Sequence, residues 1–320
     1  MDTQTGPSRA EASSPGTGSP EFIKAVPVRH PGRWVAAGVL LVFAAMFAHM
    51  LVTNEAFNWP FMVENMFSEP VLLGVRTTLV LTLLAMLIGV VVGIAVAVMR
   101  LSGNPVLAGV GWLYTWFFRA VPRLVLCVLF GNLGVLYNRI DLGLPFDHYW
   151  APLLGLESAR FYSFDTRDLL TPFVAALLAL ALSEGAYMAE IVRAGLQSVD
   201  PGQTEAAQAL GMRRSTVLRR ITLPQALRVI VPPTGNEATA MLKDTSLVAY
   251  VPLTTELWFQ LQAIGNRTYD PFPMLVAACL WYLAITSVFM VGQYLLERSF
   301  ARGDRRAGAG LRLLRVQARN

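Results

Sequence analysis

Long apolar runs separated by short polar segments form the main pattern of this chain. Most runs approach the ~20 residues that an α-helix needs to cross the hydrocarbon core of a bilayer. The fifth run contains Pro232 and Pro233, so a break in the helix is expected there. The pattern predicts an all-α polytopic membrane protein with about six transmembrane helices. The predicted spans cover residues 34–52, 71–99, 121–137 (after an interfacial approach at 105–118), 171–192, 225–251 and 273–296.

The composition supports this prediction. Hydrophobic residues make up 54% of the 320 residues and charged residues 15%, whereas an ordinary soluble domain carries about 25% charged residues. A cytosolic enzyme is therefore not favoured. The formal net charge of +5 needs no nucleic-acid partner, because basic residues gather on the cytoplasmic loops of inner-membrane proteins. The cysteines and histidines are far apart, so neither a disulfide framework nor a metal site is indicated.

Arginine is distributed unevenly along the chain, and this predicts the orientation. The loop 53–70 has no Lys or Arg, whereas the segment 193–228 is rich in arginine. The positive-inside rule then places both termini and the segment 193–228 in the cytoplasm. The loop 138–170 falls outside, and the arginines within it are a mild exception in a longer loop.

The same pattern divides the chain into four segments. The first is rich in Ser, Gly, Pro and Thr and lacks periodicity, so we expect a disordered tail. No small-residue cleavage site closely follows the first apolar run, so a signal peptide is not indicated. The segments are a cytoplasmic tail (1–30), an N-terminal helix with an outer loop (31–70), a membrane domain (71–298) with a cytoplasmic loop at 193–224, and a basic cytoplasmic tail (299–320).

A short helix is predicted in the cytoplasmic loop between the fourth and fifth spans. Asp200 can cap its N-terminus, Pro201 suits the first helical position, and Gln203 completes a capping box. Gly211 suits the left-handed position that follows a helix. The small side chains between these ends would let the helix lie close against a groove in a partner.

One spacing in this loop is long and specific. Glu205-Ala206-Ala207 is followed by Gly211 after three residues and, further on, by Leu223-Pro224. This arrangement resembles the EAA loop of ABC importer permeases. The segment 186–193, with the sequence AYMAEIVR, and the segment 243–248, with the sequence KDTSLV, resemble motifs of the polar amino-acid subfamily. The resemblance covers roughly residues 71–298.

The resemblance implies the transmembrane permease subunit of an ATP-driven importer for polar amino acids in the bacterial plasma (inner) membrane. Such a subunit forms the translocation pathway, is not an enzyme and binds no cofactor, because ATP–Mg is held by a cytosolic ABC ATPase dimer. A solute-binding protein delivers cargo to the outer face, and a second permease copy or a paralogue completes the pathway. The absence of a Walker motif agrees with this division of labour. The resemblance assigns ATPase coupling to Gly202, Gln203, Glu205, Ala206, Ala207, Gly211, Leu223 and Pro224.

Three features depart from the family pattern. The helix at 34–52 is additional to a core that often has fewer spans. The segment Arg119-Ala120-Val121-Pro122 keeps only the Arg and Pro of the usual "RGTP", and the loop 138–170 is longer than expected. The last two features leave the cargo within the family open.

Charged residues inside the predicted spans are candidates for the substrate pathway, because charge is costly in a membrane. Glu237, Lys243 and Asp244 lie in the fifth span, where their spacing is poor for pairing within one helix. We therefore expect partners on another helix or subunit. Structural pairing competes with substrate contact as an explanation of all three.

Structural pairing is the favoured interpretation of two acids in the fourth span. Glu184 and Glu190 lie six residues apart, and Arg193 is within reach of Glu190 one turn further on. The basic segment 213–220 could contact the phosphates of membrane lipid or the ATPase.

Two other classes remain as alternatives, together with an ABC permease for another small solute. An ion-coupled secondary transporter should show internal repeats, and none is evident. A membrane-embedded enzyme needs a nucleophile and a base within its spans, and His49 is the only histidine in a predicted span.

Overall fold

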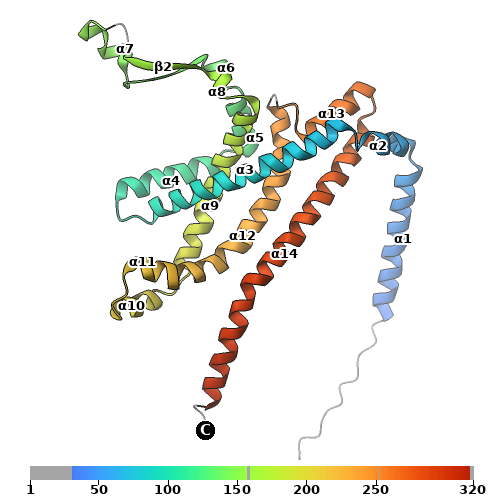
Figure 1. Cartoon of the computed structure of the whole chain (residues 1–320). Coiled ribbons are helices and arrows are strands. Elements are labelled where there is room, and N and C mark those ends of the chain that lie inside the picture. Colours follow the sequence, from blue (N-terminus) through green and yellow to red (C-terminus); the bar gives the residue numbers. More distant parts are fainter. Residues whose placement is uncertain (1–30, 157–158, 252, 318–320) are drawn as a thin grey trace, which may run out of the picture. The chain divides into compact units, whose positions relative to one another are not determined.

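The structure is a computed structural model that describes residues 31–156, 159–251 and 253–317, and most of these residues are helical (Figure 1). The predicted tail 1–30 lies outside the described residues. The chain divides into two units, Met1–Asn54 and Glu55–Asn320. The α-helices are α1 (Pro31–Thr53), α2 (Trp59–Asn65), α3 (Glu69–Arg100), α4 (Pro105–Ala120), α5 (Arg123–Gly131), α6 (Leu133–Leu136), α7 (Asp147–Trp150), α8 (Thr166–Leu169), α9 (Pro172–Gln197), α10 (Pro201–Ala209), α11 (Arg214–Val217), α12 (Leu223–Asp244), α13 (Leu257–Thr268) and α14 (Pro271–Gln317). The other elements are the 3₁₀-helices η1 (Glu55–Phe57), η2 (Pro152–Leu154) and η4 (Thr245–Tyr250), the π-helix η3 (Leu218–Thr222), and the strands β1 (Arg139–Gly143) and β2 (Arg160–Asp165).

Four helices within the described residues are long and apolar enough to cross a membrane, namely α1, α3, α9 and the Pro271–Ser299 part of α14. The bent pair α4–α5 makes a fifth span if it crosses once. The remaining predicted span corresponds to α12, which has 22 residues. This helix is less apolar than the others, because charged side chains occupy its second half. The helical membrane fold is thus confirmed, and α12 is its polar member.

The predicted break at Pro232-Pro233 is wrong, because α12 continues through both prolines. Proline removes a backbone donor and frees a carbonyl one turn earlier. A membrane helix tolerates this where neighbouring helices support it, and α12 packs against α9 and α14. Because α12 is continuous, Glu237 and Asp244 lie on the same helix that packs against α9. Figure 1 shows the two helices.

The predicted third span, residues 121–137, is not one continuous helix. Helices α4 and α5 meet at an angle of 98°, and α5 ends at Gly131. Val121 has extended backbone angles, φ −84° and ψ 127°, as the residue before a proline prefers. Because Pro122 cannot continue the helix, the chain turns sharply there and places Arg123 in the first turn of α5.

The most extensive helix contact in the second unit joins α3 to α9. Gly89 and Gly93 of α3 lie directly against Glu184 and Met188 of α9. A Cβ atom added at Gly89 would lie 2.6 Å from Cγ of Glu184, and one at Gly93 would lie 2.5 Å from Cβ of Met188. Glycine at these positions lets the two backbones approach closely, as small residues do in membrane helix pairs. This approach buries Glu184 completely.

The segment 139–165 is an exception to the all-α prediction. Strands β1 and β2 form an antiparallel hairpin, to which α7 is tied by an ion pair. The guanidinium of Arg160 lies 2.5 Å from Asp141 and 3.2 Å from Asp147. Local pairing therefore accounts for one of the arginines in the loop that the charge pattern predicts to lie outside.

Candidate functional site

A stripe of polar side chains runs along α9. Glu184, Tyr187, Glu190 and Arg193 are spaced three residues apart, so each side chain neighbours the next and the stripe winds around the helix. Glu184 is completely buried, and Glu190 has a 20% exposed side chain. In an apolar bundle, such groups persist only where they are paired or face a pathway.

The first group on this stripe is rich in acids. We define the Arg123 cluster as Arg123, Glu184, Glu237 and Asp244. The guanidinium of Arg123 lies 3.0 Å from Glu184 and 2.5 Å from Asp244, and 3.5 Å from Glu237. It also stacks over the ring of Tyr187 at 4.7 Å, a cation–π contact. One arginine of α5 thus joins two acids of α12 to one of α9.

The second group is rich in arginine. We define the Glu190 cluster as Arg100, Arg119, Glu190 and Arg193. The carboxylate of Glu190 accepts hydrogen bonds from Arg100 and Arg193, and Arg119 lies 3.9 Å away. The Arg119 guanidinium lies 5.5 Å from the centre of the Tyr187 ring. Tyr187 therefore contacts an arginine of each cluster, and the two clusters form one continuous polar path.

An open pocket of about 400 Å³ lies at the Glu190 cluster. Arg100, Arg119 and Glu190 supply its charged wall, and Thr115 donates and accepts hydrogen bonds there. Trp112 and Trp116 of α4 also line it, and their rings stack 6.2 Å apart. The pocket can hold a small polar solute with an anionic group.

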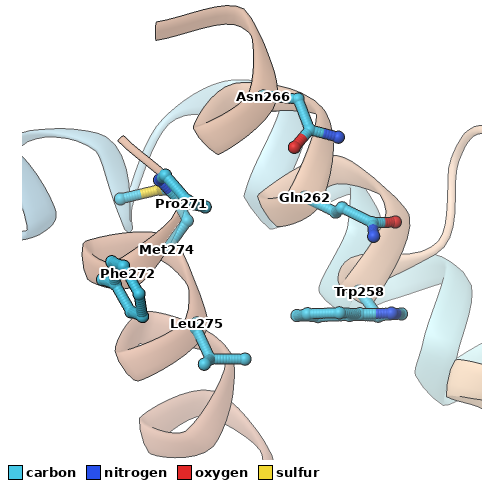
Figure 2. A pocket seen from close by; sticks show the side chains of 7 residues that line it. All are labelled: Trp258, Gln262, Asn266, Pro271, Phe272, Met274 and Leu275. Atoms are coloured by element: carbon cyan, nitrogen blue, oxygen red, sulfur yellow. The ribbon is translucent and has the colours of Figure 1, made fainter. Parts of the chain in front are cut away.

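A smaller pocket of about 150 Å³ lies between α13 and α14. Figure 2 shows Trp258, Gln262 and Asn266 along one helix, facing Phe272 and Leu275 of the other. This pocket offers aromatic and amide groups and no charged side chain. Of these two pockets, only the one at the Glu190 cluster has a charged wall.

The structure brings together two of the three predicted pathway residues. Glu237 and Asp244 share Arg123, so the expectation of partners on another helix is correct for both. Lys243 is exposed and makes no ion pair within the described residues, so it lies apart from the cluster. The predicted pairing of Glu190 with Arg193 is confirmed.

Arg123 is a site residue that was not predicted from the sequence. Its signal was present: an arginine directly after Pro122, at the start of an apolar run. The bend that turns it toward α9 and α12 depends on packing that the sequence pattern did not show.

The predicted cytoplasmic helix is α10, and both of its ends are capped. The carboxylate of Asp200 accepts a hydrogen bond of 2.8 Å from the Gly202 N–H. At the other end, Gly211 has φ +78°. The Gly211 N–H donates to the Gln208 carbonyl, and the Met212 N–H donates to the Ala207 carbonyl, the two bonds of a Schellman motif. Gly211 thus occupies the left-handed position that the sequence predicted.

The exposed face of α10 differs from the expected one. Ala207 is only 3% exposed, because α10 packs against α11 and η3 of its own chain. The Ala207 side chain therefore faces its own chain, whereas the sequence predicted that the small side chains of this helix lie against a partner. Glu205, Ala206 and Leu210 are exposed, with Leu210 at 84%. Gly202, Gln203, Leu223 and Pro224 are exposed as well.

These features define a membrane transport subunit: a charged path inside an apolar helical bundle, and a short capped helix in an arginine-rich loop. Residues 89–302 match the family described as binding-protein-dependent transport system inner membrane component, and the chain belongs to this family. It is therefore a multi-pass inner-membrane translocation subunit and not an enzyme. Subunits of this family function with an ATPase and a solute-binding protein.

Individual relatives agree with this assignment. The chain is 46% identical over 291 residues to the arginine transport system permease protein ArgU of Corynebacterium glutamicum, covering 91% of this chain and 87% of the relative. It is 35% identical to the nopaline transport system permease protein NocM of Agrobacterium fabrum, covering 68% and 82%. Among solved structures, an amino acid ABC transporter with histidines is 32% identical with a TM-score of 0.59, covering 75% of this chain and 98% of that chain. The predicted ABC permease fold and role are confirmed.

Proposed function

We propose that this chain is the permease subunit of an ATP-driven importer for polar amino acids, and that its translocation pathway follows the polar stripe of α9. The observation that carries the proposal is the path formed by the Arg123 and Glu190 clusters, which share Tyr187. A zwitterion needs partners of both signs, and the two clusters offer an excess of carboxylates and an excess of guanidinium groups. The names of the relatives, which include arginine, nopaline and glutamine transport, support the same cargo class.

The coupling to the ATPase is assigned to α10 and its flanks. An ABC ATPase dimer, which holds ATP–Mg, would contact the exposed residues of this segment: Gly202, Gln203, Glu205, Ala206, Leu210, Leu223 and Pro224. Ala207 and Gly211 contribute indirectly in this proposal. Ala207 packs α10 on its own chain, and Gly211 ends the helix. The chain itself binds no cofactor in this proposal.

The proposed orientation follows from the arginine distribution. Both termini and α10 lie in the cytoplasm, and the β1–β2 hairpin lies outside. Reporter fusions after Asn320 and within the segment 144–156 should report opposite sides of the membrane. The same side for both would contradict this topology. A second copy of this chain or a paralogue completes the pathway, surrounded by membrane lipid.

Reconstitution with the ATPase and the solute-binding protein tests the cargo. A binding protein loaded with an amino acid should stimulate ATP hydrolysis and drive ATP-dependent uptake into proteoliposomes. Stimulation by sugars or metal ions, without a response to any amino acid, would reject the cargo class. Uptake driven by an ion gradient without the ATPase would indicate a secondary transporter instead.

A further inference from the structure

The Arg123 cluster carries more negative charge than its own arginine can neutralise. Glu184, Glu237 and Asp244 all lie within 3.5 Å of a single guanidinium. The side chains of Glu237 and Asp244 are 24% and 30% exposed, so they can be reached from the pathway. Even if buried Glu184 is protonated, the single positive charge of Arg123 can balance only one of Glu237 and Asp244. One negative charge then remains unbalanced within the cluster.

One oxygen of the cluster has no partner. Oε2 of Glu184 accepts from Arg123, but Oε1 is buried and has no hydrogen-bond partner within the described residues. A buried carboxylate oxygen without a donor is costly. No group of three or more His, Cys, Asp or Glu side chains in the described part of the chain has a metal-binding arrangement. Glu184 keeps Arg123 as its donor, and the more exposed Glu237 and Asp244 are the carboxylates that a further N–H donor can reach.

We infer that the Arg123 cluster is a subsite for a cationic side chain, and that the cargo class is the basic amino acids. This inference rests on the proposed function. In the empty protein, Arg123 holds the carboxylates as the protein's own cation. An ammonium or guanidinium group of the cargo takes Glu237 and Asp244, the two more exposed members, while Arg123 keeps Glu184 and its contact with Tyr187.

The other end of the path receives the anionic group of the same cargo. In the Glu190 cluster, three guanidinium groups surround one carboxylate. Arg119 is the loosest of them: its side chain is 46% exposed, it lies 3.9 Å from Glu190, and it lines the pocket of about 400 Å³. A cargo carboxylate can bind there without displacing Arg100 or Arg193.

Equilibrium binding to the purified permease–ATPase complex, without the solute-binding protein, tests this subsite directly. Arginine has a cationic side chain, whereas glutamine has a shorter, neutral one that still carries N–H donors, so they are the probes. We expect arginine to bind at least about tenfold more tightly than glutamine. Equal binding of the two would overturn the inference, and this measurement needs no variant that could fail to fold.

Variants then locate the subsite. Glu237→Gln and Asp244→Asn should each weaken arginine binding about tenfold and leave glutamine binding within about twofold, because only the charge partner is lost. Glu64→Gln, which removes an exposed carboxylate of α2, is the control and should change neither. Equal weakening of both probes would overturn the subsite. If the complex transports only neutral amino acids, this inference fails alone; if it transports no amino acid, the proposed function fails.

Discussion

Nη1 of Arg123 lies 2.5 Å from Oδ2 of Asp244, although the two residues are 121 positions apart in the sequence. The contact joins the first turn of α5 to the last residue of α12. Glu184 of α9 lies on the other side of the same guanidinium. One arginine thus ties three helices together at the polar path.

Replacing this arginine should therefore damage stability and transport together. Arg123→Gln leaves a buried carboxylate without its charge partner, and removing one member of a buried ion pair costs about 3–5 kcal/mol. Arg123→Lys should lose less, because it keeps the charge. Thermal unfolding in detergent and ATP-dependent uptake are the measurements.

Arg76→Gln provides the comparison for Arg123. Arg76 is an exposed arginine of α3, so its loss should leave both the unfolding temperature and uptake near the wild-type values. An Arg123→Gln protein as stable as this control would show that the cluster contributes no net stability.

The end of α10 should respond to backbone conformation rather than to side-chain size. Gly211 has φ +78°, and a Cβ atom there would meet nothing within 4 Å. Gly211→Val should thus act through strain alone, about 1–3 kcal/mol, and should reduce uptake while membrane abundance is unchanged. Gly211→Asn is the matched variant, because asparagine tolerates the left-handed region. If Asn impairs uptake as strongly as Val, the conformational explanation is wrong.

Two adjacent alanines of α10 should separate partner binding from packing. Ala206 is exposed, whereas Ala207 is buried. Ala206→Leu should reduce copurification of the ATPase with little effect on the permease. Ala207→Leu should destabilise the permease itself, by about 1–3 kcal/mol for overpacking. Reversed results, with the ATPase lost only for the buried position, would contradict the proposed contact face.

Close packing of α3 on α9 should make Gly93 intolerant of even a methyl group. A Cβ atom at Gly93 would lie 2.5 Å from Cβ of Met188, whereas one at Gly109 would meet nothing within 4 Å. Gly93→Ala should lower stability by about 1–3 kcal/mol, and Gly109→Ala should not. Unfolding of both variants in detergent is the measurement, and equal stability would show that the two helices can separate without cost.

The sequence by itself determined the features whose causes are local. Apolar run length predicted α1, α3, α9 and α14, because a helix satisfies its own backbone and needs only an apolar surface of sufficient length to cross a bilayer. Asp200 and Gly211 predicted both ends of α10, because caps act within one turn. The spacing around Glu205 likewise indicated the permease family.

Only the tertiary structure decided the features that depend on direction. The predicted span 121–137 ran through Pro122, and the 98° bend that aims Arg123 at α9 and α12 depends on how α5 packs. Pro232 announced a break that packing overruled. Ala207 faces its own chain because α10 folds back on α11 and η3. Charge partners separated by 61 and 121 positions meet only when helices pack, since sequence spacing reports neighbours on one helix and nothing about neighbours across two.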